Sequence, residues 1–247
     1  MKRYNYQNIK EDTHVFHMWE PLKFEIKDNY KYIPSNFFFK LISNILALPI
    51  SILLTIIGKI LFGYKIENKG KLLKSGGFIS ISNHIHPMDC TMIGLIYYPR
   101  RIYYPTLKTN FQIPFIRHLI RLLYAIPIPT EEKQKNRFYE QINNGLINKK
   151  IVHMYPEASM WPYYEDIRNF KYGAFKMAIT ANVPIQPIKF VFTKPKGLYK
   201  LYKKQKCIHA IILDPIYPNN DLEYSKRIED LKQRTYESMK KEKKWKY

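Results

Sequence analysis

The amino-acid sequence predicts an α/β fold: a mixed, largely parallel sheet flanked by helices, with an apolar helical segment on its N-terminal side. From residue 66 onward, short runs of β-branched and aromatic residues alternate with longer amphipathic runs. Strands that alternate with helices in this way are typical of a largely parallel sheet with helices on its faces. Residues 36–65 are almost entirely apolar, and polar residues cluster at 83–89, behind the first strand-like run. Parallel sheets bind ligands at the carboxyl ends of their strands, so this cluster is the first candidate for a site.

The chain divides into three segments by composition. Residues 1–35 are polar, aromatic and mixed in charge, and they predict no helix or strand. Residues 36–65 form the apolar segment, and residues 66–247 form a domain that ends in a basic helix. With 247 residues, 46% of them hydrophobic, the chain is long and apolar enough to bury a substantial core.

The apolar segment is free of charge over the 18 residues from 41 to 58. As a helix this stretch would reach about 27 Å, whereas the hydrocarbon of a bilayer is about 30 Å thick. Pro49 lies in its middle and favours a break, because proline removes a helical hydrogen bond. Lys40 and Lys59 flank it on both sides, so charge gives no orientation. We therefore favour two short apolar helices, broken at Pro49 and lying in the membrane interface, over a transmembrane helix or a buried helical hairpin.

The first strand of the domain is predicted at 76–84, where two glycines precede an apolar run that ends in the polar cluster. Runs of Ile, Val, Tyr and Phe predict the other strands, and apolar residues spaced three and four apart predict the helices. In chain order these are a helix at 89–98, a strand at 101–109, a helix at 113–128 that runs into a short strand, a helix at 131–150, a strand at 151–155, a helix at 170–182, strands at 183–193 and 207–216, and a helix at 221–244.

The chain carries 41 Lys and Arg against 20 Asp and Glu, a formal net charge of +21. So basic a chain favours an anionic partner: a nucleic acid, an anionic bilayer or a phosphorylated substrate. No RRM, KH or helix-turn-helix pattern accompanies the charge, so nucleic-acid binding is the weakest of these hypotheses. Cys90 and Cys207 form no disulfide framework or CxxC pair, and no signal-peptide pattern is visible at the N-terminus. Both features favour a reducing, cytoplasmic setting.

The polar cluster, SNHIHPMDC at residues 82–90, permits two chemical interpretations. In the first, His84 and His86 form an H-x-H pair that binds a metal. The H-x-H-x-D-H pattern of metallo-β-lactamases places its aspartate two residues after the second histidine, whereas Asp89 lies three residues after His86. The sequence also contains no HExxH or HxxEH motif that could complete a site. No metal is therefore expected.

The second interpretation pairs His84 with Asp89 as a general base and its orienting carboxylate. Five residues along a helix turn about 500°, and an odd offset along a strand points side chains to opposite faces, so contact requires a bend. Pro87 predicts that bend, since proline favours the first helical position; His86 would then cap the helix and Asp89 would lie in its first turn. A histidine so oriented can take a proton from a substrate hydroxyl near neutral pH. The alternative is purely structural, a loop histidine beside a helix-capping aspartate.

The cluster is the first of four blocks that resemble the signature of the glycerolipid acyltransferases, the 1-acyl-glycerol-3-phosphate acyltransferase family. The pattern NH-x4-D at 83–89 matches the family's first block. The others follow in the family's order: a block led by a lysine at 108–128, VHMYPEAS at 152–159 followed by FKYGAFKMA at 170–178, and NVPIQPIKF at 182–190. The third block is similar to F-P-E-G-[ST]-R. The resemblance covers residues 66 to about 220.

The resemblance implies the glycerolipid acyltransferase fold, with acyl-CoA or acyl-carrier protein as donor and no metal or bound cofactor. It makes His84 the general base and Asp89 its partner. Glu157 would help to hold the glycerol head of the acceptor, and Pro184 and Pro187 would shape the acyl-side wall. The other residues that we expect to bind substrate are Asn83, Ser159, Lys171 and Gly173.

Two arginines of the family pattern are missing from this chain. Met160 stands at the arginine of the third block, and Thr130 falls where the second block usually closes with one. The resemblance assigns both arginines to the acceptor phosphate, which a guanidinium holds with two hydrogen bonds. Lys108, Arg168 or Lys171 is expected to supply a cation instead, unless the acceptor has another head group.

Two further departures lie in the third block. Its glycine is replaced by Ala158. The departed segment continues as MWPYY at 160–164, whose aromatic residues are expected to pack against lipid in the membrane interface.

These observations predict a membrane-bound O-acyltransferase at the cytoplasmic face of the cell membrane, anchored by residues 37–63. The enzyme would move a fatty acyl group to the hydroxyl of a lysolipid, with 1-acyl-glycerol-3-phosphate as the expected acceptor. A non-phosphate lysolipid or a glycolipid is the alternative acceptor. Membrane lipids and the acyl donor are the expected partners, and no nucleic acid is.

Overall fold

A seven-stranded sheet forms the centre of the protein. The computed structural model describes residue 6, residue 10 and residues 21–241. The strand order is β1-β7-β6-β2-β5-β3-β4, and every neighbouring pair is parallel except β6 and β7. The strands span Lys65–Glu67 (β1), Phe78–Ser82 (β2), Ile102–Thr106 (β3), Ala125–Pro127 (β4), Ile151–Met154 (β5), Ile185–Thr193 (β6) and Cys207–Ile212 (β7). The mixed, largely parallel sheet predicted from the sequence is confirmed.

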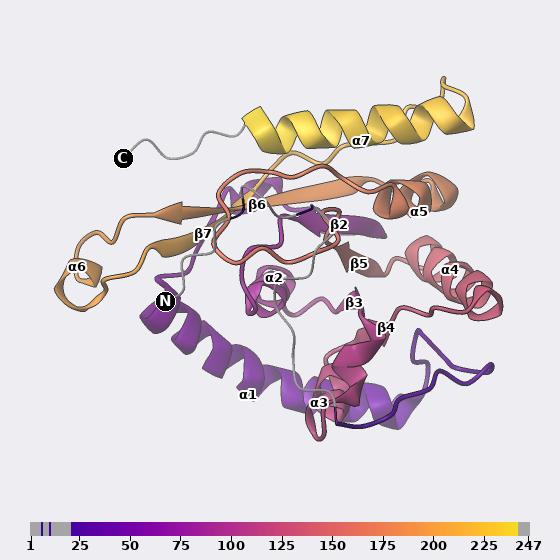
Figure 1. Ribbon diagram of the computed structural model, residues 1–247, viewed down its shortest axis with the longest axis horizontal. Coiled ribbons are helices and arrows are strands. Elements are labelled where there is room, and N and C mark those ends of the chain that lie inside the picture. The colour runs from indigo at the N-terminus through magenta and orange to yellow at the C-terminus, as the bar shows by residue number, and fades with distance from the viewer. Residues whose placement is uncertain (1–5, 7–9, 11–20, 242–247) are drawn as a thin grey trace.

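Seven α-helices accompany the sheet in the described residues (Figure 1). The helices and strands predicted from residue 66 onward are all present, with boundaries that differ by a few residues, and residues 242–244 of the last predicted helix lie outside the described residues. The sequence missed β1 and α6, which are only three and four residues long. The helices span Phe37–Phe62 (α1), Asp89–Tyr97 (α2), Ile116–Leu122 (α3), Glu132–Ile147 (α4), Gly173–Ala181 (α5), Tyr199–Tyr202 (α6) and Tyr224–Lys241 (α7), and 3₁₀ turns lie at Lys69–Lys71 and Lys108–Gln112.

The sheet separates two apolar cores. On one face, Ile79 and Ile81 of β2 pack in a cluster that includes side chains of α4, α5 and α7. On the other face, Phe78 packs with side chains of α2. All five residues of β2 are buried. Its two serines, Ser80 and Ser82, point to the same face and have buried polar partners there, the Tyr97 hydroxyl and the His153 ring. The first strand-like run therefore lies at the centre of the protein and positions whatever follows it.

The apolar segment forms one continuous helix, α1, with Pro49 inside it. Our prediction of two helices broken at Pro49 was wrong, because packing of the helix on the domain outweighs the loss of one backbone hydrogen bond. Asn36 caps its first turn, accepting a hydrogen bond from the Phe39 N–H at 3.2 Å. The helix ends at Gly63, where φ is +55° and an added Cβ would lie 2.4 Å from the sulfur of Cys207. Only glycine fits that exit.

One face of α1 packs against the domain and the opposite face is exposed and apolar. Ser43 donates to the carbonyl of Leu122 at 2.6 Å, and Arg101 donates to the Ser43 carbonyl at 2.7 Å. By length and composition α1 is the one helix among the described residues that could cross a membrane. The alternative of a buried helical hairpin is also contradicted, since α1 contains no turn. Its exposed apolar residues are Phe37, Phe38, Leu41, Ile42, Ile45, Leu48, Ile52, Leu53, Ile56, Ile60 and Leu61.

Candidate active site

His84 and Asp89 meet at the carboxyl end of β2. The Nδ1 atom of His84 lies 2.7 Å from Oδ2 of Asp89, which confirms the predicted contact. Because an ionised carboxylate only accepts hydrogen bonds, Nδ1 must carry the proton, and Nε2 is then the nitrogen that can accept one. Nε2 forms no hydrogen bond with any described residue, and the His84 side chain is 22% exposed. The His84 imidazole therefore has the tautomer of a general base, and its Nε2 atom is free to accept a proton from a substrate.

The bend lies at Pro87 as predicted, but the helix after it begins two residues later than predicted. The turn runs from His86, whose carbonyl accepts from the Asp89 N–H at 3.0 Å, and α2 begins at Asp89 with Met88 as its N-cap. Pro87 thus precedes the helix instead of opening it. Asp89 is still in the first turn, where the helix dipole stabilises its negative charge.

The Asp89 carboxylate is buried and fully hydrogen-bonded. Oδ2 also accepts the backbone N–H groups of Ile85 and His86 at 3.2 and 3.4 Å. Burial by itself would raise the pKa of Asp89, but the neighbouring His84 and the hydrogen bonds to the carboxylate hold that pKa below its usual value. Asp89 therefore stays ionised and orients the imidazole at any pH near neutrality.

Tyr155 contacts both members of the pair. Its hydroxyl donates to Oδ1 of Asp89 at 2.7 Å, and its ring stacks on the His84 imidazole with centroids 3.8 Å apart. Burial raises the pKa of the Tyr155 hydroxyl well above its usual value, so it remains a donor. The sequence did not single out Tyr155, although it stands at the phenylalanine of the F-P-E-G block and its extra hydroxyl was the available signal.

A buried chain of polar side chains runs behind the pair. The Tyr97 hydroxyl donates to Ser80 at 2.9 Å, and His153 lies 3.0 Å from Ser80 and 3.3 Å from Ser82 through its two ring nitrogens. The ring of His153 packs edge-on against Tyr155, with centroids 4.7 Å apart. Burial lowers the pKa of His153 to about 3, so this histidine is neutral and structural. Its ring packs against that of Tyr155 within the core.

His86 points away from the carboxylate. Its Nδ1 accepts the Met88 N–H at 3.1 Å, and its ring packs edge-on against Phe62 and Tyr163 with centroids 4.8 and 5.5 Å away. Burial lowers the pKa of His86. Since Phe62 is the last residue of α1, this contact joins the apolar helix to the loop that carries His84.

Glu157 supports the backbone of His84 from the neighbouring loop. Its Oε2 accepts the His84 N–H at 3.2 Å and pairs with the Arg168 guanidinium at 3.0 Å, while Oε1 accepts the Arg168 N–H at 2.9 Å. Arg168 also donates to the hydroxyl of Ser159 at 2.7 Å. Burial raises the pKa of Glu157, and Arg168 opposes that shift. The buried ion pair thus joins this loop to the backbone of His84 and uses both the Glu157 carboxylate and the Arg168 guanidinium.

Three other residues predicted to bind substrate are Asn83, Lys171 and Gly173. The amide of Asn83 is used twice by the backbone of Phe190, at 3.0 and 2.8 Å, so it ties β2 to β6. Lys171 is exposed at the end of the same loop as Glu157, and Gly173 opens α5, where an added Cβ would meet only Met154 at 3.8 Å. The structure thus gives Gly173 no steric requirement for glycine.

Lys108 lies at the same edge of the sheet as His84. It follows the end of β3, which is two strands from β2 in the order β2-β5-β3, or roughly 10 Å away at the usual spacing. Pro184 precedes β6 and so lies at the opposite edge, while Pro187 is buried within β6 opposite Ile81. The structure therefore does not bring Pro184 close to His84.

The aromatic segment at 160–164 packs inside the protein. Trp161 is buried, with the Arg168 guanidinium 4.5 Å above its ring and the Tyr6 ring stacked 4.7 Å away. The expectation that the aromatic residues of this segment pack against lipid was wrong for Trp161, because Arg168 and Tyr6 cover its ring. Ala158, at the position of the family's glycine, has a φ of +65°.

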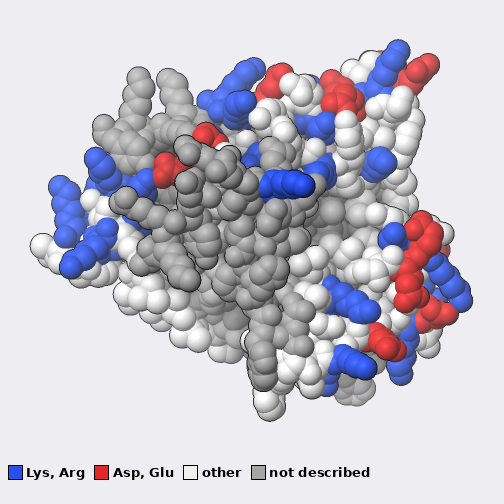
Figure 2. All heavy atoms as spheres, viewed as in Figure 1, with Lys and Arg blue, Asp and Glu red and all other residues white. Residues whose placement is uncertain are grey.

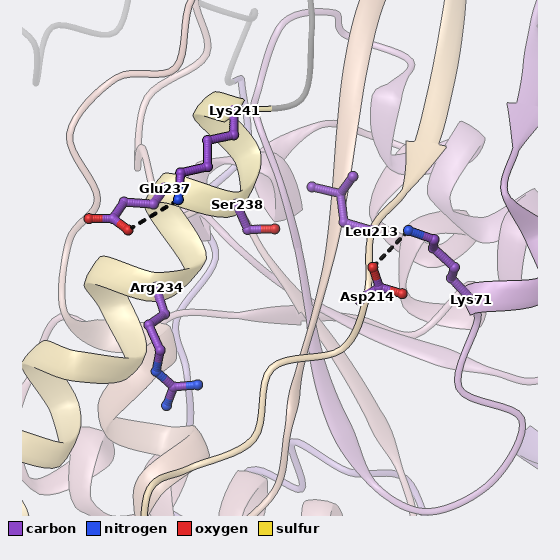
Figure 3. Close-up of a pocket in the computed structure, with 7 residues that line it drawn as sticks. All are labelled: Lys71, Leu213, Asp214, Arg234, Glu237, Ser238 and Lys241. Atoms are coloured by element: carbon purple, nitrogen blue, oxygen red, sulfur yellow. Dashed lines mark hydrogen bonds and ion pairs between the residues drawn. The ribbon is translucent and has the colours of Figure 1, made fainter.

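Two cavities lie at opposite edges of the sheet. One cavity, of about 440 Å³, is lined on one side by Leu213 and Asp214, which follow β7, and on the other by the last turns of α7 (Figure 3). At this cavity Lys71 pairs with Asp214 at 2.7 Å, and Lys241 pairs with Glu237 at 3.9 Å. Because β7 runs antiparallel to β6, this edge is the one opposite to His84. The other, of about 450 Å³, lies between the end of α1 and the first residues after β6, at the same edge as His84.

Comparisons with known proteins agree with this geometry. A model of the acyltransferase family matches residues 63–191, slightly more than half of the chain. The chain belongs to this acyltransferase family. The 1-acyl-sn-glycerol-3-phosphate acyltransferase of Bacillus subtilis (strain 168) is 26% identical over 155 residues, which are 63% of this acyltransferase and 74% of the relative.

The fold of this acyltransferase also matches a solved one. The crystal structure of the 1-acyl-sn-glycerophosphate (LPA) acyltransferase PlsC from Thermotoga maritima superposes with a TM-score of 0.52 at 20% identity, over 82% of this chain and 88% of that one. At that identity the likeness shows the shared fold. The family and the fold that the sequence predicted are thus confirmed. The region that matches the family begins at Gly63, directly after α1, and contains His84, Asp89 and Glu157.

Proposed function

We propose that this acyltransferase transfers a fatty acyl group from a thioester donor to the free hydroxyl of a lysolipid, most simply 1-acyl-glycerol-3-phosphate, which yields phosphatidate. The observation that carries the proposal is the His84–Asp89 contact of 2.7 Å with Nε2 of His84 left open, in a chain of the acyltransferase family. The relatives from Bacillus subtilis and Thermotoga maritima, whose names give this acceptor, support it.

The reaction follows from the pair. The acceptor hydroxyl donates to Nε2 of His84 and transfers its proton there as the oxygen attacks the thioester carbonyl. Asp89 stabilises the imidazolium that forms, through Nδ1. The tetrahedral intermediate then collapses, the C–S bond breaks, and the imidazolium returns its proton to the departing thiolate. The products are the acylated lipid, the free thiol of CoA or of acyl-carrier protein, and neutral His84.

The phosphate of the expected acceptor needs a cation near the pair. Lys108 is our candidate, because it follows β3 at the carboxyl ends of the strands, as His84 follows β2. Arg168 is committed to Glu157 and Ser159.

A non-phosphate acceptor is the second candidate, and the missing arginines favour it. Met160 is buried and Thr130 carries no charge, so neither position offers a guanidinium. A lysoglycolipid would need hydrogen-bonding groups there and no cation.

We further propose that α1 holds the enzyme in the interface of the cytoplasmic leaflet. One side of α1 packs on the domain while the other side exposes apolar residues, which supports a helix that lies in the interface over a helix that spans the bilayer. Its last residue touches His86, so the bilayer surface would lie beside the active site.

An acceptor screen tests the proposed reaction. The purified chain is incubated with vesicles that contain either 1-acyl-glycerol-3-phosphate or a lysoglycolipid, and with acyl-CoA or acyl-carrier protein as donor. Formation of phosphatidate at a clearly higher kcat/KM than that of the diacyl glycolipid is expected. Acylation of the glycolipid alone would transfer the assignment to the second candidate, and acylation of neither would contradict both.

A further inference from the structure

The hairpin between β6 and β7 carries an amphipathic surface that the proposed reaction does not use. It spans residues 194–206, contains α6, and extends beyond the body of the sheet (Figure 1). Six lysines and no acidic residue lie within it. Leu198 and Leu201 are 78% and 82% exposed, and Tyr202 is 56% exposed. Apolar side chains so exposed at the tip of a hairpin indicate a partner.

The hairpin is joined to the last turn of α1. The Tyr202 hydroxyl donates to the carbonyl of Ile60 at 3.1 Å, and the Lys203 ammonium donates to that of Leu61 at 2.7 Å. These carbonyls have no partner within the helix, so the hairpin completes the end of α1. Since Ile60 and Leu61 are themselves exposed, the hairpin adds two exposed leucines at the end of α1 that it contacts.

The charge of the hairpin matches an anionic surface. In Figure 2 blue side chains gather at the left edge, where Figure 1 places α6. Lys200 lies between the two leucines and Lys204 follows them, both exposed. Lysines next to inserted apolar side chains can bury their stems and keep their ammonium groups at the level of lipid phosphates. Tyr199 and Tyr202, whose rings lie 6.0 Å apart, are the residue type that prefers this depth.

We propose that the 194–206 hairpin is a second membrane-docking element, whose leucines enter the bilayer beside α1 and whose lysines select anionic phospholipids. The inference rests on the proposed interfacial position of α1 and adds a second point of attachment. Continuity with α1 favours a bilayer over an acidic carrier protein, because a carrier bound here would compete with the lipid along α1. Two attachment points would also fix the rotation of the domain about the axis of α1.

Three single-cysteine labels test where the hairpin lies. Leu201→Cys reports on the hairpin, Ile52→Cys on α1, and Lys226→Cys on α7, which covers the other face of the sheet. Each full-length variant is labelled with an environment-sensitive thiol probe and mixed with vesicles of phosphatidylcholine and phosphatidylglycerol. Signal from Cys90 and Cys207 is subtracted with the unsubstituted protein. We expect blue-shifted emission and quenching by brominated lipid at positions 52 and 201, and neither at 226.

The outcomes separate the two proposals. A response at 52 with position 201 remaining in water would overturn the hairpin inference and leave α1 as the anchor. Water at both positions would overturn the inference together with the interfacial position of α1. Acylation of lysophosphatidate in detergent micelles, measured on the same variants, reports separately on the proposed reaction.

Charge selection is tested with Lys200→Gln/Lys204→Gln. Each lysine near an anionic surface is worth about 1 kcal/mol, roughly a factor of five, so two contribute at most about 25-fold. The partition ratio between phosphatidylglycerol and phosphatidylcholine vesicles should fall by about tenfold or more. The matched control, Lys176→Gln/Lys226→Gln on α5 and α7, removes the same charge and should leave the ratio unchanged. Equal ratios for the two double variants would overturn the selection of anionic lipid by the hairpin.

Discussion

The ring of Tyr155 lies flat against the imidazole of His84, with centroids 3.8 Å and planes 12° apart, while its hydroxyl donates to Asp89. One side chain therefore restrains the plane of the base and the position of the acid. The stack prevents the imidazole from tilting, and the hydrogen bond holds the carboxylate oxygen that His84 does not use. An aromatic ring alone would supply only the first restraint.

Tyr155→Phe should therefore lower kcat about tenfold while KM changes little. The stack is kept, but Oδ1 of the buried Asp89 loses a charge-assisted hydrogen bond, which is typically worth about 1.5–3 kcal/mol. Steady-state kinetics with lysophosphatidate measure the split. Tyr139→Phe, the same change on the exposed side of α4, is the control. An unchanged kcat would show that the hydroxyl does not position the pair.

His84→Ala should lower kcat by about 10²–10⁴-fold, since it removes the imidazole that accepts the proton in the proposed reaction. Asp89→Asn should also be severely impaired, because an amide does not stabilise the imidazolium. His118→Ala, which removes an exposed imidazole on α3, is the control for the substitution. Turnover that persists in a folded His84→Ala variant would contradict the assignment and direct attention to His86.

Lys108→Gln should raise KM for 1-acyl-glycerol-3-phosphate roughly tenfold and leave that for a lysoglycolipid unchanged, because only the first acceptor carries a phosphate. Lys69→Gln makes the same change at the opposite edge of the sheet and should affect neither. Equal KM values for Lys108→Gln and the parent chain would remove Lys108 from the acceptor site.

Glu157→Gln should destabilise the fold by about 3–5 kcal/mol, since it leaves the buried Arg168 charge without its partner. Denaturant unfolding measures the change. Glu132→Gln is the matched control, because its pair with Lys135 is exposed and should contribute less than about 1 kcal/mol. The double variant Glu157→Gln/Arg168→Met should regain part of the loss. Similar values for Glu157→Gln and Glu132→Gln would refute a buried, ionised pair.

Stability should fall as the pH is lowered from 7.5 to 5. The pKa of His153 is about 3 in the folded protein and near 6.5 in an unfolded chain, so the unfolded chain binds more protons over this range. The stabilisation is complete above pH 6.5, and His153 alone should account for a loss of about 2 kcal/mol by pH 5. His86, whose pKa is also lowered by burial, should add to the slope. Unfolding free energies of the parent and of His153→Gln check this, and equal slopes would contradict it.

Most of the fold could be predicted because the signals were local. The alternation of strands and helices, and the break in hydrophobic periodicity at each turn, follow from short stretches of sequence. The two elements that were not predicted, β1 and α6, are held by partners that are distant in the sequence: β1 pairs with β7, and Tyr202 of α6 donates to the carbonyl of Ile60 in α1. Pro49 misled the prediction for the same reason, since tertiary packing holds α1 straight through a residue that locally favours a break.

The site could be predicted only where its residues are close in sequence. His84 and Asp89 are separated by a single bend, so their contact followed from spacing. The roles of Tyr155 and Glu157 depend on β5 lying next to β2, and no local pattern states that a tyrosine hydroxyl would point at Asp89. The charge on Arg168 suggested that it binds the phosphate of the acceptor, but in the fold its guanidinium is buried and pairs with Glu157.

The contact between Phe62 and His86 has a kinetic consequence. If α1 lies in the leaflet, the imidazole of His84 stays at the membrane surface, and an acceptor can reach it by lateral diffusion with its acyl tail still in the bilayer. Rates should then track the mole fraction of acceptor within the vesicle, so that adding inert lipid slows the enzyme even when the total amount of acceptor in the tube is constant.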